Sequence, residues 1–271
     1  DMIRHLLQLI WNQRKQNAWL WAELLLVSVF LWFLVDYLYV LGRTYTAPLG
    51  FDIRHTYSIV ISSLSERSPD YIPKEKRERP DGVHLLTALD RIRTYPGVES
   101  ACLTDGGMPY YMGSRNLVWR IDTLQVPCRY AFVTPEFFDV FRIYDKDGKT
   151  ASLKRAIEDN NSIVISADVE TMNPGLSLLG QKAYRGNVTD EIEETIRGIS
   201  VPIRRHEYTK AEPNVYRALR LSRMEEGYYE GMIDAVRLCV RVRPDVDNAD
   251  FPARFRKDMA EQLRLGNLYL L

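Results

Sequence analysis

The stretch from Trp19 to Leu41 reads WLWAELLLVSVFLWFLVDYLYVL and carries no charge in its central half. At 1.5 Å per residue, a helix over this stretch reaches roughly 34 Å, enough to cross a hydrocarbon core of about 30 Å. Trp21, Tyr37 and Tyr39 stand near its ends, where amphipathic rings favour the depth of the lipid headgroups. Residues 19–41 are therefore predicted to form a transmembrane helix.

Two other interpretations of this stretch fit less well. A cleaved signal peptide has a shorter apolar run and a small-residue cleavage site, whereas Tyr39 and Arg43 occupy that region here. A buried core helix rarely runs this long without a polar face. Glu23 and Asp36 lie near the ends of the stretch, where carboxylates can reach the interface, although pairing with a partner helix stays open.

The charges before the stretch set the expected orientation. Arg4, Arg14 and Lys15 precede it, and no acidic residue lies in residues 2–22. The positive-inside rule then places residues 1–18 in the cytoplasm and the main part of the chain outside.

Residues 2–11 (MIRHLLQLIW) place Ile3, Leu6, Leu7 and Ile10 at helical spacing. This spacing predicts an amphipathic helix lying on the inner membrane surface.

Composition excludes several classes of protein. The chain has 36 Lys and Arg against 36 Asp and Glu, so it has no basic field for nucleic acid. Three cysteines, Cys102, Cys128 and Cys239, are too few for a disulfide-rich scaffold. Buried free thiols are the expected state, and one bridge outside the cytoplasm stays an alternative.

After the span, strand and helix patterns alternate. Strands are predicted over 56–63, 98–104, 116–121, 127–133, 162–166, 180–184, 196–203, 235–243 and 267–271. Helices are predicted over 84–95, after Thr134 as an N-cap with Pro135 in the first turn, and after Asp250 as an N-cap. Residues 42–55 are expected to be a linker outside any core.

The strand over 235–243 (AVRLCVRVR) has the clearest alternation. Its apolar residues alternate with Arg237, Cys239, Arg241 and Arg243, which predicts one buried face and one solvated face. With the helix that follows, it forms a second β-α-β pattern that echoes the one over 56–104.

The predicted fold class is therefore α+β, an N-terminal transmembrane helix followed by two β-α-β halves with a mainly β subdomain inserted between them. The two halves are assigned to residues 42–132 and 233–271, and the insertion to residues 133–232.

No catalytic, cofactor or metal site is predicted. The four histidines are scattered, with no partner at metal-ligand spacing, and Gly148-Lys149-Thr150 lacks the first glycine of a phosphate-binding loop. The sequence thus indicates no enzyme activity in this chain. Two aromatic clusters in loops are candidate partner contacts, with loop packing as the alternative: Tyr110, Tyr111, Met112, Tyr228 and Tyr229.

The order of these parts resembles the permease subunit of MacB-type ABC transporters, which include FtsX-like and lipoprotein-release permeases. The resemblance runs over nearly the whole chain, in the basic start MIRHLLQLIWNQRK, the span, IRTYPGVES at 92–100, VTPEFFDVF at 133–141, SIVIS at 162–166, Leu179-Gly180-Gln181 and RLGNLYL at 264–270. The Asn-Ala-Trp run at 17–19 resembles the version found in Bacteroidetes.

The resemblance implies a bacterial inner-membrane subunit with a periplasmic domain of porter-like and sabre-like parts. It also implies a cytoplasmic ABC ATPase on a separate subunit, a homo- or heterodimer of permeases, and a periplasmic adaptor or outer-membrane partner. ATP hydrolysis would drive motion of the outer domain. Such permeases have at least four spans, so we expect the natural chain to continue beyond Leu271. The alternative is a single-pass, membrane-anchored sensor or binding module.

Overall fold

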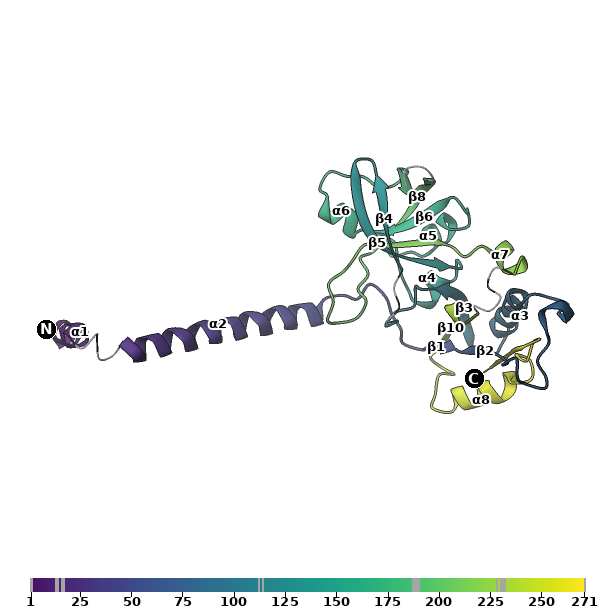
Figure 1. Cartoon of the computed structure of the whole chain (residues 1–271), viewed down its shortest axis with the longest axis horizontal. Helices are drawn as coiled ribbons and strands as arrows, with labels where there is room; N and C mark the ends of the chain where they lie inside the picture. Colours follow the sequence, from purple (N-terminus) through teal and green to yellow (C-terminus); the bar gives the residue numbers. More distant parts are fainter. Residues whose placement is uncertain are drawn as a thin grey trace. The chain divides into compact units, whose positions relative to one another are not determined.

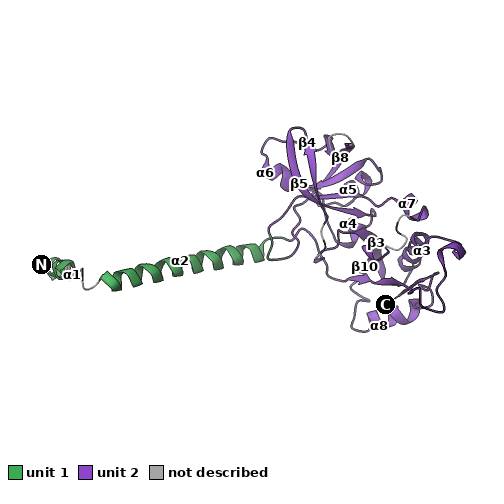
Figure 2. Ribbon diagram, viewed as in Figure 1, with its two compact units in different colours: residues 1–48, 207–209 green, residues 49–206, 210–271 purple. Residues whose placement is uncertain are grey.

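The computed structural model describes residues 2–12, 15, 18–111, 113, 115–186, 191–227, 229 and 233–270, except for the side chains of Leu7, Ile10 and Leu270. The chain divides into two compact units (Figure 2). Unit 1 contains residues 1–48 and 207–209, and unit 2 contains residues 49–206 and 210–271.

Unit 1 is built of two helices, α1 (Met2–Asn12) and α2 (Ala18–Thr46). Both helices were predicted from the sequence, and α2 runs five residues past the predicted end at Leu41. No residue of α2 is buried, and its mean hydropathy reaches 2.3 over 18 residues. Within the described residues, α2 is one helix long and apolar enough to cross a membrane.

Unit 2 contains eleven described strands, and nine of them form one sheet in the order β1-β10-β3-β5-β4-β7-β8-β6-β9, in which β9 also pairs with β5 (Figure 1). The strands are β1 (Thr56–Ile59), β2 (Ile61–Ser63), β3 (Val98–Asp105), β4 (Asn116–Ile121), β5 (Leu124–Val133), β6 (Ser162–Ser166), β7 (Lys182–Arg185), β8 (Ile192–Ser200), β9 (Asn214–Ala218), β10 (Val236–Val242) and β11 (Leu268–Leu270). The fold class is α+β, as predicted.

The helices of unit 2 are short. They are η1 (Lys74–Lys76), α3 (Asp81–Arg93), α4 (Phe137–Val140), α5 (Ala151–Ala156), α6 (Asp168–Met172), α7 (Leu221–Glu225), η2 (Ile233–Ala235) and α8 (Phe251–Met259). The helices alternate with the strands along the chain. They cover parts of the sheet and remove its apolar side chains from water.

The first predicted β-α-β unit is a split one. Both β1 and β3 pair antiparallel with β10, so they run parallel to each other with β10 between them, and α3 makes the crossover. The strand β11 does not join this sheet, because it pairs with β2 in a separate two-stranded sheet.

Three apolar clusters hold unit 2 together. The first packs α3 and α8 against β1, β3 and β10 and includes Leu85, Ile92 and Phe255. The second gathers Phe137 and Phe138 with residues of β5 and β6. The third surrounds Trp119 on β4. The division of the outer part at residues 132 and 233 stays a prediction.

The expected solvated face of β10 is wrong at Cys239 and Arg241, whereas Arg243, directly after the strand, is exposed as predicted. Arg241 is 1% exposed, and Cys239 is buried as well. Cys239 lies in the second cluster, because the α4 region covers the face of β10 that was expected to meet water. Only Arg237 of the strand is partly exposed.

Of the two predicted N-caps, Thr134 is wrong and Asp250 is at the predicted position. Thr134 does not cap the helix that follows, because its hydroxyl accepts a hydrogen bond from the Leu103 amide at 3.1 Å. That helix begins at Phe137, two residues after the predicted first position at Pro135. Asp250 does stand at the N-cap of α8, but its side chain makes no capping hydrogen bond.

The predicted linker over residues 42–55 is wrong as well. The helix α2 continues to Thr46, and unit 2 begins at Leu49, which leaves Ala47 and Pro48 between them. We call residues 49–55 the entry segment. Its Leu49 carbonyl accepts from the Arg204 amide at 3.0 Å, and its Asp52 amide donates to the Phe141 carbonyl at 2.8 Å.

Arg241 ties the entry segment to the sheet. Its guanidinium donates to the carbonyls of Asp52 at 2.5 Å, Arg54 at 2.8 Å and Val140 at 2.7 Å. At Gly50, φ is +83° and an added Cβ would lie 2.1 Å from the Pro202 carbonyl oxygen, so only glycine fits there. The entry segment is part of the packed domain.

Candidate functional site

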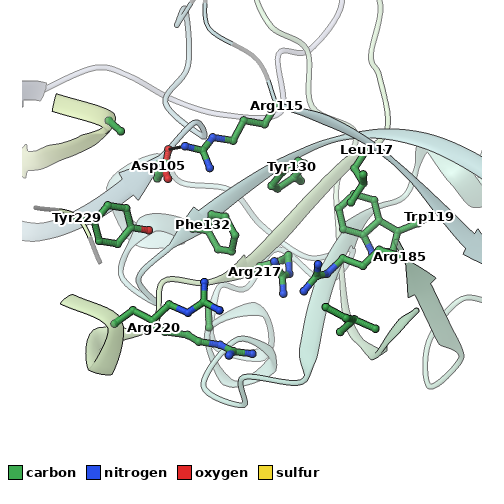
Figure 3. Close-up of a pocket in the computed structure, with 14 residues that line it drawn as sticks. Asp105, Arg115, Leu117, Trp119, Tyr130, Phe132, Arg185, Arg217, Arg220 and Tyr229 are labelled. Carbon is green, nitrogen blue, oxygen red and sulfur yellow. Dashed lines mark ion pairs between the residues drawn. The ribbon is translucent and has the colours of Figure 1, made fainter. Parts of the chain in front are cut away.

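A cavity of about 340 Å³ opens on unit 2 beside the strands β5, β4, β7 and β9 (Figure 3). We call it the arginine pocket. Its lining combines guanidinium groups, aromatic rings and one carboxylate, from Arg115, Arg185, Arg217, Arg220, Arg223, Trp119, Tyr130, Phe132, Tyr229 and Asp105.

Strand alternation explains why rings and charges share this face. On β5, Tyr130 and Phe132 point into the pocket, while Ala131 and Val133 belong to the apolar cluster on the other side of the sheet. The neighbouring strand β9 runs parallel to β5 and places Arg217 directly opposite Phe132. Arg217 is itself buried, like most of β9, and its side chain lines the pocket.

The rings form a continuous row along the wall of the pocket. Trp119 and Tyr130 meet edge to face with their centroids 5.7 Å apart, and Tyr130 and Phe132 do the same at 5.8 Å. The guanidinium carbon of Arg217 lies 4.9 Å from the centre of the Phe132 ring. This distance is within the range of a cation–π interaction.

A buried carboxylate holds the inner arginines. Glu194 is 2% exposed and accepts from Arg217 at 2.5 and 2.7 Å and from the Trp119 indole at 3.3 Å. The Arg185 Nε lies 3.3 Å from the same carboxylate. Burial lowers the pKa of the Arg217 guanidinium, and Glu194 acts in the opposite direction. One carboxylate thus faces two guanidinium groups.

The outer arginines are more accessible. Arg115 is 42% exposed and pairs at 3.0 Å with Asp105, a buried carboxyl whose pKa is raised by burial and lowered by that arginine. Arg220 is partly exposed and has no ion pair with a carboxylate among the described residues. Figure 3 shows Arg217 and Arg220 on the same side as Phe132. An acidic ligand entering the pocket would meet these groups.

The sequence-predicted partner contacts do not come together in one site. Tyr110 follows β3 at φ +60°, is 38% exposed and meets Phe51 edge to face at 5.8 Å. Tyr111 is partly buried. Tyr229 lines the arginine pocket and is 5% exposed, so its expected exposure is wrong. Met112 and Tyr228 lie outside the described residues, and contact of these side chains with a partner stays a prediction.

The three cysteines are free and buried. Cys102 on β3 lies directly opposite Cys239 on β10, and burial raises the pKa of the Cys102 thiol well above its ordinary value. In the described part of the chain, no cluster of three or more His, Cys, Asp or Glu side chains could hold a metal ion.

Sequence reasoning missed the arginine pocket. Its lining comes from strands far apart in the chain, which become neighbours only through the sheet order. One signal was available. The segment NVYRALR (214–220) places Arg217 inside an otherwise apolar strand, and a charge at such a position needs a partner or a ligand.

No family model matches the sequence, and no curated protein matches it. Several solved structures are similar to this chain. A domain of a permease protein from Porphyromonas gingivalis is 16% identical, with a TM-score of 0.49 over 82% of this chain and 92% of that one. The extracellular domain of the noncanonic ABC-type transporter YknZ from Gram-positive bacteria is 12% identical, with a TM-score of 0.48 over 80% and 99%.

A third similar structure is the periplasmic region of MacB from Actinobacillus actinomycetemcomitans, at 9% identity and a TM-score of 0.45 over 84% of this chain and 93% of that one. The chain is similar to outer domains of ABC-type transporters. MacB is the protein after which the family in the sequence resemblance is named.

Proposed function

We propose that this chain is part of the permease subunit of a MacB- or FtsX-type ABC transporter, in which the outer domain transmits motion driven by ATP hydrolysis. The helix α2 spans the bacterial inner membrane, with the N-terminus in the cytoplasm and unit 2 in the periplasm. The order of sequence motifs supports this proposal, together with the positive charges that precede α2.

The proposed transmission of motion is supported mainly by the short connection between α2 and unit 2. Only Ala47 and Pro48 separate the helix from the entry segment. Proline restricts its own backbone, and the entry segment is fixed by the Arg241 hydrogen bonds and by backbone bonds to residues 141 and 204. We therefore infer that little flexible chain is present to absorb a movement of α2 before it is transmitted to the entry segment.

The partners follow from the same proposal. A cytoplasmic ABC ATPase on a separate subunit supplies the energy, and two permeases form a homo- or heterodimer. A periplasmic adaptor or outer-membrane protein, or the substrate itself, receives the motion. Within unit 2, residues 42–132 and 233–271 would form the porter-like part and residues 133–232 the sabre-like part.

The test uses the full-length permease purified with its ATPase. A spin label at an exposed turn residue, introduced as Lys146→Cys, reports the distance between the outer domains of the two permeases. We expect this distance to change between the nucleotide-free and the vanadate-trapped ATP states. An unchanged distance, or the absence of any co-purifying ATPase, would contradict the proposal.

An insertion tests the connection itself. About ten Gly and Ser residues placed after Ala47 should leave ATPase activity in place and abolish the nucleotide-dependent distance change, because flexible chain absorbs displacement. The same insertion after Gly175, in an exposed turn with open space around it and away from the label, is the control and should leave the distance change intact. A sensor or an anchored binding module would tolerate both insertions equally.

A further inference from the structure

We propose that the arginine pocket binds a small acidic ligand, in which a phosphate or carboxylate group is attached to an aromatic or apolar body. This site stands apart from the proposed function, since it requires neither the ATPase nor motion of the domain.

The charge balance of the pocket favours an anion. Five arginines line it, and the carboxylates that face them are Asp105, in the lining, and Glu194 behind it. Glu194 is already engaged by Arg217, Arg185 and the Trp119 indole, so it cannot neutralise the outer arginines. Arg223 has an interaction of its own and does not enter this balance. Among the described residues, Arg220 leaves the lining with a positive charge in excess, and a concave site concentrates that field.

Arg220 is the group best placed to meet a ligand. It is partly exposed, it lines the cavity two residues after the end of β9, and no described carboxylate forms an ion pair with it. Guanidinium groups bind phosphate and carboxylate through two parallel hydrogen bonds, so arginine is the side chain suited to such an anion.

The aromatic wall favours an apolar body on the ligand. Tyr130 and Phe132 are only partly buried and present ring surface to the cavity, and Leu117 and Ile192 add aliphatic surface. A bare inorganic anion would leave these surfaces in contact with water. A ligand that combines an acid with a ring covers the wall and reaches the arginines together.

The volume limits the size of the ligand. About 340 Å³ lies at the small end of ligand pockets, which span roughly 300–1,000 Å³. A single ring with one acidic group fits this space. The acyl chains of a diacyl lipid do not, so a lipid could insert only its phosphate-bearing end.

Phenyl phosphate is the probe, titrated by calorimetry into the full chain in a neutral detergent. We expect saturable binding at one site, at least about tenfold tighter than inorganic phosphate, with no saturable binding of benzyl alcohol. Equal affinity for phenyl phosphate and inorganic phosphate, or no saturable binding of phenyl phosphate, would overturn the proposal.

Variants connect the binding to the pocket. Arg220→Gln should weaken phenyl phosphate binding about tenfold or more, the loss expected for one charged hydrogen-bond donor. Arg220→Lys should restore part of that loss. The control is Arg155→Gln, the same change on the exposed face of α5, which should leave the affinity unchanged. If Arg155→Gln weakens binding as much as Arg220→Gln with both proteins folded, the pocket is not the site.

A second titration distinguishes the sources of the ligand. Dihexanoyl phosphatidylglycerol, used below its micelle-forming concentration, carries a phosphate on a short lipid. Tighter binding of this lipid than of phenyl phosphate identifies a lipid headgroup as the ligand, and weaker binding identifies a free small acid. Binding of neither compound overturns the proposal.

Discussion

Replacing Arg241 with methionine should destabilise unit 2 and release the entry segment. Arg241 is 1% exposed, and its guanidinium donates to three carbonyls at 2.5–2.8 Å. Methionine fills much of the same space without a donor, so the three carbonyls lose their charged partner. Two of them, those of Asp52 and Arg54, belong to the entry segment.

The expected magnitude comes from opposing contributions. A hydrogen bond from a charged donor contributes about 1.5–3 kcal/mol, which gives an upper limit of roughly 9 kcal/mol for three. Removing a buried charge recovers its desolvation cost and offsets part of this loss. We therefore expect the free energy of unfolding to fall by about 3–5 kcal/mol, which at roughly 2–4 °C per kcal/mol lowers Tm by about 6–20 °C.

Two measurements check this expectation on the full chain in detergent. Thermal melts followed by circular dichroism report the change in Tm. Hydrogen exchange followed by mass spectrometry should show faster exchange in peptides that cover residues 49–55, where the Asp52 amide is bonded to the Phe141 carbonyl. The control is Arg237→Met, on the same strand but partly exposed and expected to change stability by at most about 0.5 kcal/mol.

If Arg241→Met melts within about 2 °C of the wild type and exchange in the entry segment is unchanged, the three hydrogen bonds neither stabilise unit 2 nor hold the entry segment. A loss of stability without faster exchange in that segment would mean that the three hydrogen bonds stabilise the sheet but do not hold the entry segment.

Four further predictions concern other parts of unit 2. A hydrogen bond from Tyr57 holds the pKa of Asp247 below its ordinary value. The Asp247 carboxylate therefore stabilises the fold fully above about pH 3.9, and this stabilisation is lost as the pH falls through the lower pKa of the folded state. Thermal melts between pH 2 and 6, with Asp247→Asn as control, test this expectation. Burial and that carboxylate raise the pKa of Tyr57 to about 12, so its contribution is complete below about pH 10 and is lost as the pH rises through about 12, as alkaline melts will show. Burial raises the pKa of the Cys102 thiol well above its ordinary value and that of the Cys128 thiol to about 12. In the folded protein these two thiols should therefore react with Ellman's reagent at pH 8 at least about 100-fold more slowly than in the unfolded chain. Gly198→Ala would place a Cβ 2.8 Å from a side chain of β6 and should cost about 1–3 kcal/mol, measured by thermal melts.

Local pattern predicted the elements of this fold well. Residues 116–121 and 162–166 are strands with the expected bounds, since a short β-branched or alternating run limited by turn residues determines a strand locally. The apolar spacing of Phe251, Phe255 and Met259 likewise gave the buried face of α8. Each of these inferences needs only residues close together in the chain.

The errors arise where a distant segment decides the outcome. Arg241 was expected in water because alternation describes one strand and does not show that the entry segment and α4 cover its second face. Thr134 was expected to cap a helix, but the neighbouring strand takes its hydroxyl. The arginine pocket escaped prediction for the same reason, because the sheet order that assembles it is not written in any single segment.

The position of β10 also has a consequence for biosynthesis. Thr56 of β1 pairs with Arg241 of β10, and Val98 of β3 pairs with Val242, so the middle strand of this trio is the last to leave the ribosome. Until β10 is synthesised, both neighbours lack their central partner. Pairing between such distant segments closes slowly, and an unpaired strand edge is prone to association. In the proposed topology, the facing edges of β1 and β3 must therefore stay unpaired, and shielded from other chains, until β10 has also crossed the membrane.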